Sequence, residues 1–152
     1  MQNKQIVRIS PPSLLKLGAC LIYDALVIIA LSFACALLFV WLLGEATQGV
    51  KHYLLQLFLW LSIGVYFVWC WHKSGQTLAM QAWKLKLVTQ EDVNQAPQLL
   101  TFKLAIARYA LASVGLMLFG VGFLWVIVDR DTLFLHDRLL KTQIISNYLR
   151  ST

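Results

Sequence analysis

The feature that most constrains the fold is an apolar run at residues 17–43, which is long enough to cross a lipid bilayer as one helix. The run contains a single carboxylate, Asp24, and no basic residue. A carboxylate inside a spanning helix costs about 2.5–3.5 kcal/mol on insertion scales, so such residues face a protein interior or a watery path and have a polar partner. The run therefore predicts a membrane protein with a buried polar site. It exceeds the apolar core of about 7–15 residues found in a cleavable signal and is expected to be retained.

The composition indicates the same class of protein. Hydrophobic residues make up 59% of the chain and charged residues 13%, with a mean hydropathy of +0.68. An ordinary soluble domain has about 25% charged residues. The net charge is +6, but the basic residues lie at the edges of apolar runs and form no stripe with stacking aromatics. We therefore expect the lipid bilayer as a partner and no nucleic acid.

Two further apolar segments follow, at 53–71 and 104–128. The polar link between the first two segments is short, which makes them antiparallel neighbours. Alternating polar and apolar residues at 84–89 and 141–146 predict two short strands, which can pair only on one side of the membrane.

These elements predict an all-α membrane protein, a small antiparallel bundle of transmembrane helices with a short cytoplasmic β-like element. The chain has no linker rich in Pro, Gly or Ser, so one transmembrane domain is expected at 13–146, between an N-terminal tail at 1–12 and a C-terminal tail at 147–152.

The third segment allows two topologies. If 104–128 is one straight span, seven of the basic residues in the loops and tails lie on the cytoplasmic side and five on the opposite side. If the segment bends and returns, eleven lie on the cytoplasmic side and one on the opposite side. The positive-inside rule favours the bent form, with both termini cytoplasmic. Gly115, Gly120 and Gly122 offer positions for the break, but the segment also has an ordinary length for one tilted helix. Both alternatives stay open at this point.

A second buried charge, Arg108, lies within the third segment at a depth similar to that of Asp24. Small residues on its helical face, Ala105 and Ala112 among them, would let another helix approach closely. We expect Asp24 and Arg108 to form an ion pair or to line one polar pocket, with Lys16 as an alternative counter-charge for Asp24. The simpler interpretations are a structural pair that locks two helices and, for Arg108 alone, snorkelling to the headgroups.

A polar cluster near the C-terminus contains His136 and Asp137. His136 could relay protons near neutral pH with Asp137 orienting it, although an interfacial histidine is commonly just solvated. The chain shows no phosphate loop, nucleophile elbow or metal-binding spacing, and its three cysteines have no CxxC pattern. No enzyme activity, cofactor or metal is therefore expected.

Three short motifs, in this order and spacing, resemble the RDD family of membrane proteins over residues 13–146. They are Leu17-Gly18-Ala19-Cys20-Leu21-Ile22-Tyr23-Asp24, then Gly75-Gln76-Thr77-Leu78, and finally Leu135-His136-Asp137-Arg138-Leu139 with Lys141-Thr142. The resemblance places the family's two aspartates on Asp24 and Asp137. The family's arginine has no counterpart, because Lys16 stands near its expected place and lacks the bidentate fork of a guanidinium.

The resemblance implies little about activity, since the family has no generally established biochemical function and a role in transport has been suggested for it. We expect an integral, multi-pass inner-membrane protein involved in transport of an ion or small ligand. Asp24, Arg108, Lys16, His136 and Asp137 are the candidate ligand-, ion- or proton-sensitive residues. Three spans enclose little space, so a homo-oligomer or a membrane protein partner is expected. The alternative is a non-catalytic interaction or assembly protein whose buried charges are structural.

Overall fold

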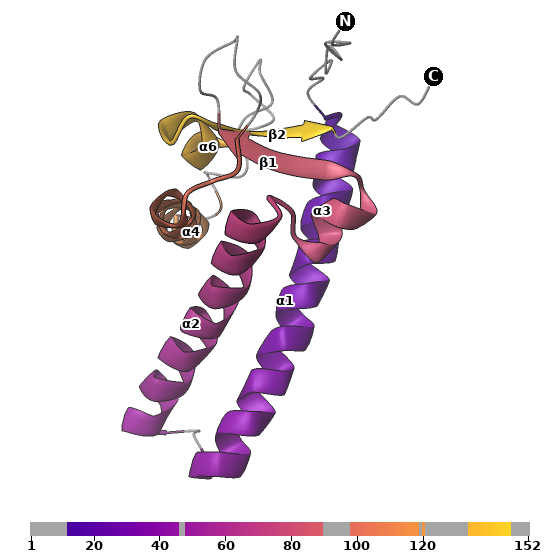
Figure 1. The fold of residues 1–152 in the computed structure, drawn as a ribbon. Helices are drawn as coiled ribbons and strands as arrows, with labels where there is room; N and C mark the ends of the chain where they lie inside the picture. Colours follow the sequence, from indigo (N-terminus) through magenta and orange to yellow (C-terminus); the bar gives the residue numbers. More distant parts are fainter. Residues whose placement is uncertain (1–11, 46–47, 90–97, 119, 121–133, 147–152) are drawn as a thin grey trace, which may run out of the picture.

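The computed structural model describes residues 12–45, 48–89, 98–118, 120 and 134–146. Two long helices, α1 (Leu14–Leu43) and α2 (Val50–Lys73), form an antiparallel hairpin that Figure 1 shows from the side. The side chain of Ser13 caps α1 by accepting a hydrogen bond from the backbone N–H of Lys16. The helix ends at Gly44, whose φ of 76° stops the helical hydrogen bonding.

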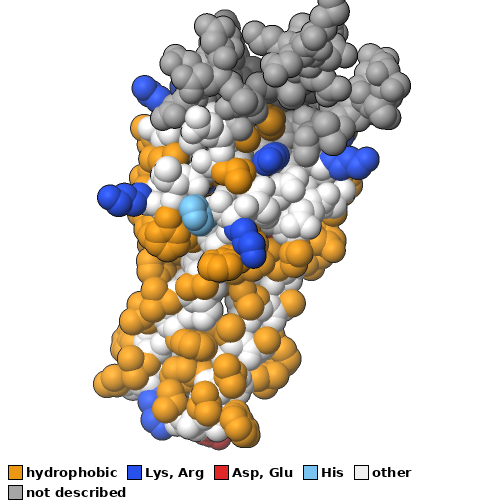
Figure 2. Space-filling model, in the orientation of Figure 1, with side chains coloured by type: hydrophobic (Ala, Val, Ile, Leu, Met, Phe, Trp, Pro, Cys, Tyr) orange, Lys and Arg blue, Asp and Glu red, His pale blue; other side chains and the backbone are white. Residues whose placement is uncertain are grey.

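The surface of this hairpin is suited to lipid. At 1.5 Å per residue, helices of 30 and 24 residues are about 45 and 36 Å long, and the hydrocarbon core of a bilayer is about 30 Å thick. Only 6% of the most apolar window of α1 and 22% of that of α2 is buried within the fold. Apolar side chains cover the part of the surface formed by the hairpin (Figure 2). The described part of the chain therefore leaves most of the surface of these helices uncovered, as expected of helices that lie in a bilayer.

The remaining elements gather at the end of the hairpin where α1 begins and α2 ends (Figure 1). They are α3 (Leu78–Ala82), β1 (Leu85–Thr89), α4 (Phe102–Met117), α6 (Leu135–Leu139) and β2 (Thr142–Ser146). The strands pair antiparallel, with Leu85 opposite Ser146 and Leu87 opposite Ile144. The pairing of the two predicted strands is confirmed. It also places the end of the described chain at the same end of the hairpin as the start of α1.

The two strands belong to two copies of one structural unit. In each unit a five-residue helix leads through a lysine with positive φ, Lys84 (54°) or Lys141 (52°), into a five-residue strand. Corresponding residues lie 57 positions apart, as Leu78 and Leu135 do at the starts of the two helices. Leu87 and Ile144 are counterparts and also face each other in the sheet, so a local two-fold axis passes between them.

The core lies beneath this sheet. Leu85, Leu87, Leu100, Ala79 and Ala105 are fully enclosed. They pack with residues from the start of α1 and the end of α2, among them Leu17 and Trp71. The sheet and the two short helices therefore hold the ends of α1, α2 and α4 in fixed positions around the residues described below.

The third apolar segment differs from the predicted bundle helix. Within the described residues it forms α4, whose 16 residues measure about 24 Å and fall short of the hydrocarbon core. Figure 1 shows α4 nearly along its axis, so it crosses the hairpin steeply. A third span is therefore not confirmed. Whether the third segment is straight or bent depends on residues 121–128, which lie outside the described residues. Most of the two predicted tails also lies outside them.

Helix α4 passes through Gly115 without a break and approaches α2 through a different glycine. A Cβ atom on Gly64 of α2 would come within 2.8 Å of the Tyr109 ring. The Tyr109 hydroxyl donates a hydrogen bond to the backbone carbonyl of Trp60 at 2.8 Å. The small residues of the third segment predict a close approach to another helix. In the structure this approach depends on a small residue of the second segment, Gly64.

Candidate functional site

Asp24 lies on the inward face of α1. Leu17, Cys20 and Asp24 are spaced three and four residues apart, share one side of the helix and are buried, while the large side chains between them are exposed. Asp24 is 9% exposed although it belongs to a helix whose surface is mostly free. The sequence-based expectation that this carboxylate faces the protein interior is confirmed.

Thr77 is the polar partner of Asp24 that the sequence did not reveal. Its hydroxyl donates a hydrogen bond of 3.2 Å to Asp24 Oδ2, and the Cys20 thiol lies 3.9 Å from the same oxygen. The other oxygen, Oδ1, is buried and has no hydrogen-bond partner among the described residues. Both partners of Oδ2 are neutral, so they solvate the carboxylate in part without balancing its charge.

The Gly75-Gln76-Thr77 motif explains how Thr77 reaches this position. Gly75 has a φ of 70°, and its carbonyl accepts a hydrogen bond from the N–H of Leu87 in β1 at 2.7 Å. The Gln76 side chain donates to the Leu85 carbonyl at 2.6 Å. Thr77 then caps α3 by accepting a hydrogen bond from the N–H of Met80. Each residue of the motif therefore fixes the turn that presents the Thr77 hydroxyl to α1.

Arg108 is paired with Asp137, which corrects the predicted ion pair with Asp24. Its Nε lies 2.8 Å from Asp137 Oδ1, and the Thr142 hydroxyl donates to the same oxygen at 2.8 Å. The guanidinium also lies over the Trp71 ring, 4.3 Å from its centroid. The pair forms because α6 carries Asp137 over the start of α4, a contact that no local pattern predicts. The guanidinium is buried and does not snorkel.

His136 is buried beside this pair and is not solvated at an interface. It is 4% exposed, and its ring stacks on Phe134 with an interplanar angle of 3°. Burial, followed by the Arg108 charge, lowers the pKa of His136 to about 4, while the Asp137 carboxylate opposes this shift. The imidazole is therefore neutral near pH 7.

The lowered pKa of His136 predicts a specific loss of stability in acid. Between about pH 6.5 and pH 4 the unfolded chain binds a proton on His136 that the folded chain does not bind, so stability falls as pH falls. The expected loss is about 3 kcal/mol across this window. Urea unfolding at a series of pH values would measure it. In His136→Gln this part of the pH dependence should vanish, and an unchanged slope would contradict the assignment.

Lys16 lies apart from the other candidate residues. It is partly exposed in the first turn of α1, and the described part of the chain gives it no carboxylate partner. Neither of the two proposed counter-charges, Lys16 and Arg108, forms an ion pair with Asp24 in the described part of the chain.

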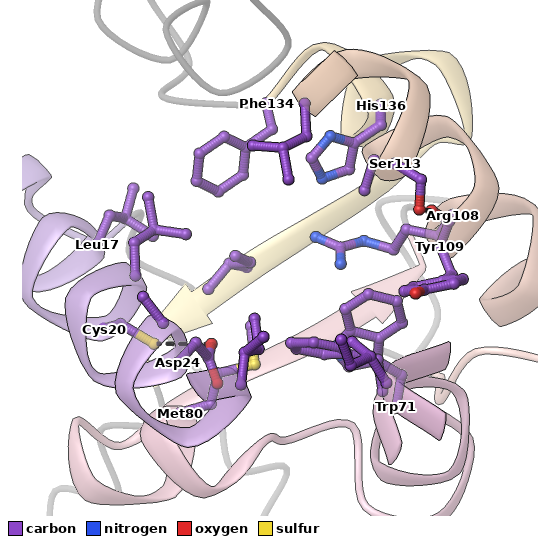
Figure 3. A pocket seen from close by; sticks show the side chains of 18 of the residues that line it. Leu17, Cys20, Asp24, Trp71, Met80, Arg108, Tyr109, Ser113, Phe134 and His136 are labelled. Carbon is purple, nitrogen blue, oxygen red and sulfur yellow. Dashed lines mark hydrogen bonds between the residues drawn. The ribbon is translucent and has the colours of Figure 1, made fainter. Parts of the chain in front are cut away.

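Asp24 and Arg108 line one cavity of about 560 Å³ between α1, α2 and α4. Figure 3 shows the carboxylate and the guanidinium pointing into it from different walls, with His136 above and Trp71 below. The rest of the described lining is mainly apolar and aromatic, including Phe67 and Tyr109. The expectation that Asp24 and Arg108 share a pocket therefore agrees with the structure. Asp137 forms an ion pair with Arg108 and does not itself line the cavity.

Two apolar helices of spanning length, a cavity at one of their ends and a buried carboxylate in its wall define a membrane protein with an internal polar site. Comparison with known protein families matches residues 14–141 to the RDD family. The chain belongs to that family, as the sequence motifs predict. Neither a curated protein nor a solved structure matches the chain.

Proposed function

We propose that the chain is a transport module of the inner membrane that binds an ion or small ligand in the cavity between α1, α2 and α4. The observation that carries this proposal is Asp24 Oδ1, a buried acceptor in the wall of a 560 Å³ cavity that has no hydrogen-bond partner in the described part of the chain. A buried polar atom without a partner destabilises the fold by about 1–3 kcal/mol, so each such atom requires an explanation, and a bound ion or ligand is one. Bound cargo would supply the missing partner.

The distribution of basic residues supports an orientation for this module. Described lysines and arginines gather at the sheet end of the hairpin (Figure 2), whereas Lys51, in the first turn of α2, lies at the opposite end. The sheet-end residues are Lys16, Lys73, Lys84, Lys86, Lys103, Arg138 and Lys141. Under the positive-inside rule the sheet faces the cytoplasm, with both termini on that side. Labelling of a cysteine introduced near residue 152 by a membrane-impermeant reagent would test this orientation.

Transport is tested by reconstitution in liposomes that enclose a pH- or cation-sensitive dye. Asp24→Asn should lower the flux driven by a gradient at least about tenfold, because it removes the charge while keeping the shape of the side chain. Glu45→Gln is the matched control, since it removes an exposed carboxylate from the link between α1 and α2. Equal flux in wild type and in a folded Asp24→Asn variant would contradict the proposal.

A second candidate function is assembly, in which the buried charges only fix the packing of helices. The observation that favours it is that both charged residues make hydrogen bonds within the chain, Asp24 with the neutral Thr77 and Arg108 with Asp137. Two helices of spanning length cannot enclose a pathway alone, so either function calls for a homo-oligomer or a membrane protein partner. Absence of flux under every gradient, with a stable oligomer in the same membranes, would favour assembly.

A further inference from the structure

Among the residues that the structure describes, the buried charges around the cavity do not balance. Asp137 neutralises Arg108 through a contact of 2.8 Å, and the low pKa of His136 keeps its imidazole uncharged at neutral pH. Asp24 is left with two neutral donors, the Thr77 hydroxyl and the Cys20 thiol. When Asp24 is ionised, the cavity has one uncompensated negative charge. A cation is therefore the complementary ligand, whereas a zwitterion or an anion would leave a charge unpaired.

The free oxygen of Asp24 indicates what kind of cation fits. Oδ1 is a buried acceptor without a donor among the described residues, and the hydrogen bond that the Arg108 Nε makes is directed to Asp137 and not to Asp24. A protonated amine provides an N–H donor together with a positive charge, and a charge-assisted hydrogen bond is about twice as strong as a neutral one.

The walls of the cavity favour an organic cation over a metal ion. Tyr109 adjoins two other aromatic residues of the wall. Its ring centroid lies 5.4 Å from that of Trp60 and 6.4 Å from that of Phe67. Aromatic faces attract organic cations and pack against apolar groups. Hard metal ions require several oxygen ligands, which this mainly apolar lining does not offer among its described residues. The volume lies within the range of about 300–1,000 Å³ that is typical of small-molecule sites.

We propose that the cavity binds a monovalent organic cation, a protonated amine with an apolar body, whose N–H donates to Asp24 Oδ1 while its apolar part contacts the aromatic wall. This inference rests on the proposed function, because it names the class of cargo. Binding can nevertheless be measured in detergent without any gradient. A chain that binds amines but transports nothing would overturn the proposed function and leave this inference standing, and the reverse result would overturn the inference alone.

Calorimetric titration of the purified full chain would use three probes of similar shape, 2-phenylethylammonium, 2-phenylethanol and 3-phenylpropionate. The ammonium should bind at least about tenfold more tightly than the neutral or anionic probe. Asp24→Asn should abolish this preference, whereas Glu45→Gln should retain it. Ala112→Leu should weaken ammonium binding by filling the cavity without changing a charge, which keeps the test valid if Asp24→Asn does not fold.

Equal affinity for the three probes would overturn the inference, as would undiminished ammonium binding in a folded Asp24→Asn variant. An infrared band of a protonated carboxyl group at neutral pH that is absent from Asp24→Asn would also overturn it. In that case the empty cavity would already be electrically balanced.

Discussion

Replacement of Arg108 with methionine is expected to lower the free energy of unfolding by about 3–5 kcal/mol, because it leaves Asp137 buried without a counter-charge. Asp137 is 1% exposed, so water cannot replace the guanidinium. The change also removes the cation from the face of Trp71. Chemical denaturation in detergent, followed by tryptophan fluorescence, would measure the loss.

The matched control is Lys103→Met, which removes an exposed positive charge from the first turn of the same helix and should change stability by no more than about 0.5 kcal/mol. Adding Asp137→Leu to Arg108→Met should recover part of the loss, since no buried charge then remains. The charge exchange Arg108→Asp with Asp137→Arg should also recover stability relative to either single change. A loss below about 1 kcal/mol in Arg108→Met would show that the pair is not a principal support of the fold.

Substitution of Gly75 with alanine is expected to lower the free energy of unfolding by about 2–4 kcal/mol, through a strained backbone and a steric overlap. The φ of Gly75 is 70°, and a Cβ atom there would lie 2.8 Å from the Leu87 carbonyl oxygen and from Leu99 Cδ2. The carbonyl belongs to a paired strand and cannot move without disturbing the sheet. Thermal unfolding in detergent would report the effect.

The variant Gly49→Ala separates the cost of the strained backbone from the cost of the steric overlap. Gly49 has nearly the same φ, 69°, but a Cβ atom there would meet no other atom within 4 Å. This variant should therefore lose only the backbone part, about 1–3 kcal/mol. Equal losses in Gly75→Ala and Gly49→Ala would show that the contact with β1 contributes nothing.

The parts of the fold that depend on local hydropathy could be predicted from the sequence. The two spanning helices follow from long apolar runs, and the strands at 85–89 and 142–146 follow from alternating residues. The short helices α3 and α6 were not predicted, because five residues contain too few turns to show a period. The steep crossing of α4 depends on packing against Gly64 and Trp60, which its own sequence does not encode.

Asp24, Arg108 and His136, which line the cavity, could be picked out from the sequence, whereas Lys16 lies apart from it and the pairing of the charged residues could not be predicted. Asp24, Arg108, His136 and Asp137 stand out because charged or titratable groups are conspicuous next to apolar segments. Their partners depend on tertiary contacts across 53 residues for Thr77 and Asp24 and across 29 for Arg108 and Asp137. Thr77 lies in a motif that resembles the family pattern, but a threonine beside a turn gives no sign that its hydroxyl reaches a distant helix.

The repeated unit of a short helix and a strand carries a different residue at the same position in its two copies. Thr77 and Phe134 are counterparts in the two units, and each occupies the N-cap of its short helix. One presents a hydroxyl to the carboxylate of α1, and the other presents a ring to the imidazole of its own unit. The same position of a repeated backbone thus carries a hydroxyl in one unit and an aromatic ring in the other, so the two halves of a symmetric scaffold contribute different chemistry to the buried groups around them.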